Sequence, residues 1–100
     1  IINIASMYGV VAPDFTIYGN SGQDNPLYYG VAKAGVVQMT KFAASNLGPK
    51  NIRVNAVSPG PFPNPGKCPP TDFLEEMGKK TLLGRIGSPE EIAGAIAFLA

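Results

Sequence analysis

The sequence contains no histidine, no tryptophan and a single cysteine, Cys68. The lack of histidine excludes Ser-His-Asp and Cys-His catalytic arrangements, and it leaves no Cys/His cluster that could bind zinc. One cysteine cannot form an internal disulfide, which favours a reducing, cytoplasmic compartment. Any acid-base chemistry must therefore come from tyrosine, lysine, aspartate or glutamate.

Charge is also sparse, at 15% of residues, and eight basic residues against seven acidic ones leave a net charge of +1. No block of like charge runs along the chain, so neither nucleic acid nor an anionic membrane is an expected partner. No apolar run approaches the ~20 residues that cross a bilayer. The hydrophobic fraction of 45% argues against disorder, and 100 residues suffice for one small domain or part of a larger one.

The first half of the chain has the pattern of a strand, a helix and a second strand. Residues 1–6 and 52–58 are β-prone, and apolar residues recur at helical spacing from about Tyr28 to Leu47. The loop between the first strand and the helix is rich in turn-forming residues from Pro13 to Pro26.

In the second half, prolines from Pro59 to Pro70 disfavour regular structure, and a short helix is expected from about Asp72 to Lys80. Ser88, followed by Pro89 and Glu91, is typical of a helix start, with Ser88 as the N-cap. Strand, helix, strand, helix is the order of a parallel α/β sheet.

Both ends of the sequence look internal to a longer protein. The chain begins within a predicted strand, and the last helix reaches Ala100 without a terminating residue. Two parallel strands also need neighbours on both faces and edges, so we expect a fragment whose flanks are supplied elsewhere.

A tyrosine and a lysine, Tyr29 and Lys33, lie four residues apart at the start of the long helix and so share one face. A nearby cation favours the phenolate, so the pair is a candidate for proton exchange. The spacing alone is weak evidence for catalysis, since a packed tyrosine beside a solvated lysine can have the same spacing. However, Ser6 ends the first strand and Pro59-Gly60 follow the second. Ligands in open parallel sheets bind beyond such strand ends, so one cleft is expected.

Four segments in this order resemble the C-terminal half of a classical short-chain dehydrogenase/reductase: Asn3 to Ser6, Tyr29-x-x-x-Lys33, Asn55 to Gly60 and Gly84 to Ile92. The resemblance covers nearly the whole chain. It implies part of a Rossmann-like, doubly wound parallel α/β sheet, with residues 1–100 as the C-terminal catalytic part of a single NAD(P)-binding domain whose N-terminal cofactor-binding half is absent. The implied activity is NAD(P)-dependent interconversion of an alcohol and a carbonyl by hydride transfer.

The resemblance also implies residue roles. Tyr29 would be the general acid or base, Ser6 would hold the substrate oxygen, and Lys33 would ease ionisation of Tyr29 and bind the nicotinamide ribose. The cofactor would be NAD or NADP, and no metal is implied. The residues expected to contact the cofactor are Tyr29, Lys33, Pro59, Gly60, Phe62 and Asn64, the last standing near where classical members often carry threonine. Those expected to contact substrate are Ser6, Tyr8 and Tyr29, although packing is the simpler role for Tyr8.

The gap between Ser6 and Tyr29 is longer than classical members usually show. The extra residues are polar and predict an insertion over the active site that favours a sugar or sugar acid; a solvated surface loop is the simpler alternative. Other functions left open are a 3-oxoacyl thioester reductase, an extended-type nucleotide-sugar epimerase or dehydratase, and a catalytically silent binding protein. The resemblance further implies a homodimer or homotetramer formed through an apolar aspect of the long helix that includes Val36, Met39 and Phe42; burial under a neighbouring helix of the same chain is the alternative. The fragment alone is expected to be inactive.

Overall fold

The computed structural model describes residues 1–64, 67 and 70–100. Its sheet consists of β1 (Ile2–Ile4) and β2 (Asn55–Val57), which pair in parallel with Asn3 opposite Ala56. The helix α1 (Leu27–Leu47) connects them. The predicted strand, helix, strand order is therefore confirmed, although each strand is shorter than the β-prone run that contains it.

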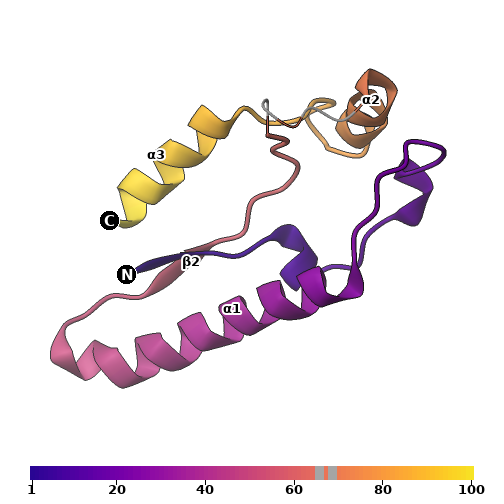
Figure 1. The fold of residues 1–100 in the computed structure, drawn as a ribbon. Helices are drawn as coiled ribbons and strands as arrows, with labels where there is room; N and C mark the ends of the chain where they lie inside the picture. Colours follow the sequence, from indigo (N-terminus) through magenta and orange to yellow (C-terminus); the bar gives the residue numbers. More distant parts are fainter. Residues whose placement is uncertain (65–66, 68–69) are drawn as a thin grey trace.

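The helices lie on both sides of the sheet. Figure 1 shows α1 along one side of the two strands and α3 (Pro89–Leu99) along the other, and both helices contact β2. This three-layer arrangement is that of a doubly wound α/β fold. The expected fold class is therefore confirmed for the part of the sheet that this chain supplies.

A buried threonine fixes α1 against β1. Thr40 accepts a hydrogen bond from the side-chain amide of Asn3 at 2.9 Å and donates one to the carbonyl of Val36 at 2.7 Å. Only 7% of Thr40 is exposed. Because both of these polar groups are paired, they can be buried without the penalty of an unsatisfied hydrogen-bonding group.

The last helix begins as its sequence predicts. Ser88 and Glu91 form a capping box, in which the backbone N–H of Ser88 donates to Glu91 Oε2 at 2.8 Å. Arg85 also binds the Glu91 carboxylate through both guanidinium nitrogens, at 2.8 and 2.7 Å. These contacts, the ion pair with Arg85 foremost, lower the pKa of Glu91 to about 2.

A second, smaller unit lies beyond one end of the sheet. It contains α2 (Thr71–Lys79) and the short 3-10 helix η2 (Phe15–Ile17), which contact each other (Figure 1). Residues 59–64, from the proline-rich stretch, form neither helix nor strand, as predicted. Residues 65, 66, 68 and 69, which the same prediction covers and which include Cys68, lie outside the described residues.

The described part of the chain is open rather than compact. Its radius of gyration is 15.4 Å, against about 13 Å for a compact domain of this length. Several large apolar side chains are exposed, including Leu27, Val31, Phe42 and Phe98. Two parallel strands leave such faces uncovered. Among the described helices, none is both long and apolar enough to span a bilayer.

Candidate active site

Backbone hydrogen bonds bring the ends of the two strands together. The N–H of Ala5 donates to the carbonyl of Val57 at 2.8 Å, and the N–H of Met7 donates to the carbonyl of Pro59 at 3.0 Å. The pairing therefore continues beyond the strands themselves. As the sequence predicts, Ser6 and the segment that starts at Gly60 lie at the same edge of the sheet.

Ser6 is held in place by the turn that it begins. It is the N-cap of the 3-10 turn η1 (Met7–Gly9), and its Oγ accepts the backbone N–H of Tyr8 at 3.2 Å. Ser6 is 7% exposed. A serine hydroxyl that accepts one hydrogen bond still has its proton to donate, so Ser6 can donate to an oxygen atom in the adjoining space.

Two glycines allow η1 to approach the first turns of α1. A Cβ on Gly9 would lie 2.8 Å from the carbonyl atoms of Lys33, and a Cβ on Gly30 would lie 3.1 Å from the carbonyl oxygen of Tyr8. A side chain at Gly9 would therefore meet backbone that cannot move freely. This contact sets the distance between Ser6 and the helix that carries Tyr29.

Tyr29 and Lys33 lie on one face of α1, as their spacing predicts. The Lys33 ammonium is 5.7 Å from the centre of the Tyr29 ring. It also donates a hydrogen bond to the carbonyl of Ile4 at 2.9 Å, which ties this face of α1 to the end of β1. The arrangement places a fixed positive charge next to the phenol.

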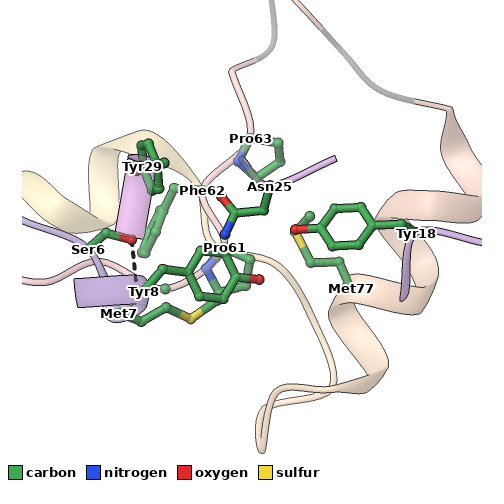
Figure 2. A pocket seen from close by; sticks show the side chains of 11 residues that line it. Ser6, Met7, Tyr8, Tyr18, Asn25, Tyr29, Pro61, Phe62, Pro63 and Met77 are labelled. Carbon is green, nitrogen blue, oxygen red and sulfur yellow. Dashed lines mark hydrogen bonds between the residues drawn. The ribbon is translucent and has the colours of Figure 1, made fainter. Parts of the chain in front are cut away.

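The cavity beside these groups has a volume of about 240 Å³. This is slightly below the ~300–1,000 Å³ typical of ligand sites in proteins and suits a small molecule. Figure 2 shows Ser6 and Tyr29 at one side and Tyr18 and Met77 at the other. The lining residues are Ser6, Met7, Tyr8, Tyr18, Asn25, Tyr29, Gly60, Pro61, Phe62, Pro63 and Met77.

Most, but not all, of the residues singled out in the sequence lie on this cavity. Its lining omits Pro59, Lys33 and Asn64. Pro59 contributes the carbonyl that binds Met7, and Lys33 lies against Tyr29. Asn64 lines a separate cavity near the start of α3, so its contact with a cofactor carboxamide stays a prediction.

One wall of the cavity is flat and apolar. It is formed by Gly60, Pro61 and Phe62. A Cβ on Gly87 would come within 2.7 Å of three atoms of the Phe62 ring, and the N–H of Gly87 donates to the carbonyl of Pro61 at 3.0 Å. The glycine therefore leaves room for the ring. An apolar strip with a few hydroxyls nearby is the usual lining of a ligand pocket, and its contact with a nicotinamide ring stays a prediction.

The cavity lining also includes hydrogen-bonding groups. Tyr8, Tyr18 and Asn25 line the cavity, and the hydroxyls of the two tyrosines point toward each other in Figure 2. Burial, and next the hydrogen bond to Tyr8, raise the pKa of Tyr18 above its usual value. The Tyr18 hydroxyl is therefore a neutral hydrogen-bonding group over the whole physiological range.

The predicted polar loop divides into two parts. Tyr18 and Asn25 line the cavity. In contrast, Asp14 pairs at 2.8 Å with Lys80, the residue that follows α2, and Asn20, Gln23 and Asp24 are exposed.

Some lining residues were not anticipated. Met7, Pro61 and Pro63 are sequence neighbours of assigned residues, and this adjacency was a usable signal. No sequence signal indicated Met77, because it reaches the cavity only through the packing of α2.

These features define part of a Rossmann-like α/β domain with a cavity at the strand ends, and comparison with known proteins agrees. A family model described as enoyl-(acyl carrier protein) reductase matches residues 1–100. The chain belongs to the short-chain dehydrogenase/reductase family.

Relatives and a solved structure give the same result. The chain is 45% identical to a Thermotoga maritima 3-oxoacyl-[acyl-carrier-protein] reductase and 38% identical to a Bacteroides fragilis 7alpha-hydroxysteroid dehydrogenase. All of this chain is covered in both, but it spans only 37% and 36% of their lengths. A short-chain dehydrogenase from Leptospira borgpetersenii, solved with bound NAD+, superposes with a TM-score of 0.87 at 37% identity. That match covers 99% of this chain and 36% of the other.

Proposed function

We propose that this chain is the C-terminal catalytic part of an NAD- or NADP-dependent enzyme that interconverts an alcohol and a carbonyl. The observation that carries the proposal is the convergence of Ser6, Tyr29 and the Gly60 to Phe62 strip on one cavity. Family membership supports it. A cofactor-binding N-terminal half would complete the domain, and the cytoplasmic location expected from the sequence stays a prediction.

Each hydroxyl has a distinct part in the proposed reaction. The bound nicotinamide supplies or accepts the hydride at the substrate carbon. In the reductive direction, Tyr29 donates its phenolic proton to the substrate oxygen, and in the oxidative direction it takes that proton back. Ser6 donates a hydrogen bond to the same oxygen and orients it. The ammonium of Lys33, 5.7 Å from the ring centre, would place a positive charge beside the phenol while its proton is transferred.

The test uses the full-length protein that carries this chain. NADH and NADPH oxidation is measured with ketoses, keto acids and 3-oxoacyl thioesters. Tyr29→Phe is expected to lower kcat by about 10²- to 10⁴-fold, the usual contribution of a general acid. Tyr28→Phe is the matched control, because Tyr28 is the adjacent residue and is 75% exposed. Full activity in Tyr29→Phe, or no redox turnover with any compound, contradicts the proposal.

We further propose that the substrate carries a second oxygen-bearing group, as a sugar or sugar acid does. Support comes from hydrogen-bonding side chains that line the cavity in addition to Ser6 and Tyr29, namely Tyr8, Tyr18 and Asn25. Asn25→Ala is expected to reduce kcat/KM for hydroxylated ketones about three- to tenfold, the value of one hydrogen bond. Asn20→Ala, in the same loop but not on the cavity, is the control. An equal loss with a simple cyclic ketone contradicts this substrate class.

Reduction of a 3-oxoacyl thioester is the second candidate. It is favoured by the name of the Thermotoga maritima relative. The apolar lining residues Met7, Pro61 and Met77 also suit an acyl chain. The same substrate panel separates the two, because an acyl reductase would prefer the thioesters and tolerate Asn25→Ala. A nucleotide-sugar epimerase or dehydratase would instead convert its substrate without net consumption of NADH.

We also propose that the full-length protein is a homodimer or homotetramer that associates through α1. The support is a set of apolar side chains that this helix leaves exposed, among them Met39 and Phe42. Phe42→Glu is expected to reduce the assembly to smaller species in sedimentation velocity. An unchanged sedimentation coefficient contradicts this surface.

A further inference from the structure

Two segments that are far apart in the sequence form the far side of the cavity. Tyr18, immediately after η2, lies on that side together with Met77 of α2 (Figure 2). Neither segment belongs to the sheet, just beyond whose β1 strand Ser6 lies. Their positions relative to each other therefore affect the width of the cavity, and contacts between them matter for substrate binding.

An aromatic stack and an ion pair join these segments. The rings of Tyr18 and Phe73 stack with centroids 5.6 Å apart and planes at 24°. Lys80 Nζ lies 2.8 Å from Asp14 Oδ2. Phe73 is 5% exposed, and Ile17 of η2 is also buried. The contact is thus a small apolar cluster flanked by a charge pair.

The contacts on α2 follow helical spacing. Phe73 and Met77 of α2 and Lys80, its C-cap, are at positions i, i+4 and i+7, which lie on one face of a helix. The residue that lines the cavity is therefore located between the stacked ring and the ion-paired lysine. Movement of this face away from η2 would displace Met77.

The carboxylate of Asp14 is already oriented by its own turn. Its Oδ1 accepts hydrogen bonds from the backbone N–H and the hydroxyl of Thr16, at 3.0 and 2.6 Å. Its Oδ2 is thereby directed to Lys80. Because Asp14 is fixed beforehand, the pair loses less side-chain entropy than two free side chains would.

We propose that Asp14 and Lys80 are positioning residues: with the Tyr18–Phe73 stack they form a latch that holds η2 against α2 and sets the fit of the substrate. The proposal rests on the proposed function, since the cavity is taken to be the substrate site. Neither residue contacts the reacting atoms. The latch therefore acts on substrate KM rather than on kcat.

The kinetic test uses Lys80→Gln, Asp14→Asn and the double variant of the full-length protein. Asparagine keeps an oxygen that can cap η2, so Asp14→Asn removes chiefly the charge. Each single variant is expected to raise substrate KM about two- to fivefold, the range for an exposed ion pair, with kcat unchanged. The KM of the double variant should be no higher than that of either single variant. At 1 M salt, where the screening length is ~3 Å, the difference from wild type should disappear.

Lys79→Gln is the matched control. Lys79 is the adjacent lysine and pairs with Glu76 within α2, so its removal breaks an ion pair without touching η2. Its KM should equal that of the wild type. An unchanged KM in Lys80→Gln, an equal rise in Lys79→Gln, or additive effects in the double variant would overturn the latch.

A second measurement does not depend on catalysis. Amide hydrogen exchange in residues 14–18 should be faster in Lys80→Gln than in wild type or Lys79→Gln, with no substrate present. Unchanged exchange overturns the latch whatever the kinetics show. Faster exchange in a protein without redox activity supports the latch while contradicting the proposed function, so the two can be told apart.

Discussion

Replacing Gly9 by alanine tests whether the spacing between η1 and α1 determines the geometry of the active site. The new Cβ would lie 2.8 Å from the carbonyl carbon and oxygen of Lys33 and 2.9 Å from the N–H nitrogen of Ala34. Ordinary contacts begin at 3.4 Å, so η1 and α1 must separate by about 0.6 Å. The atoms that interfere are backbone atoms of a helix, which cannot rotate out of the way.

The consequences follow from that displacement. Overpacking of this kind typically costs ~1–3 kcal/mol, so the free energy of unfolding should fall by that amount. The same shift moves Tyr29 relative to Ser6. Because a misplacement of 1 Å can cost about 100-fold in rate, a shift of about 0.6 Å should lower kcat roughly tenfold.

The assays are urea unfolding and steady-state kinetics on the full-length protein. The control is Gly35→Ala. Gly35 is in α1, the helix that Gly9 faces, but outside the helix's own backbone no atom lies within 4 Å of the new Cβ. There, alanine should stabilise the helix by up to ~1 kcal/mol and leave kcat unchanged. Wild-type stability and kcat in Gly9→Ala would refute the reasoning.

Three further outcomes are expected. Thr40→Val should lower the free energy of unfolding by ~1–3 kcal/mol in urea titrations, because the half-buried amide of Asn3 loses its acceptor, whereas Thr40→Ser should not. Gly87→Ala should raise the KM for NADH or NADPH roughly tenfold, because the new Cβ would displace the Phe62 ring from the apolar wall of the cavity. Glu91→Gln should remove the stability that the Arg85 pair supplies. Since the pKa of Glu91 is lowered from 4.5 to about 2, this difference from wild type should persist above pH 4.5 and vanish as the pH falls to about 2. A difference that stays constant from pH 7 to 2 would contradict the assignment to Glu91.

The parts of the fold that depend on local patterns were predictable from sequence. Ser88 and Glu91 form the capping box that their spacing indicates, and α1 begins at Leu27, one residue from the predicted start. The strands were overestimated. Val54 is buried like a strand residue, but β2 begins only at Asn55, since β-propensity describes a buried environment rather than pairing.

The candidate site was predictable where it follows the strand ends and the Tyr29 to Lys33 spacing. The far side was not, because Tyr18 meets Phe73 across more than half of the chain and no local pattern records such a contact. Likewise, a glycine is required at position 9 only because the backbone of Lys33 lies opposite it. Long-range packing of this kind has to be observed in the structure.

The hydrogen bonds from Ala5 to Val57 and from Met7 to Pro59, which join the strand ends, are made by backbone atoms and do not depend on the side chains at Met7 and Pro61. Side chains on the cavity wall can therefore change while that frame persists. Met7 and Pro61 are positions where mutation can enlarge or reshape the site, and directed evolution of substrate preference would do best to begin there. The geometry of the strand ends would be inherited unchanged by each variant.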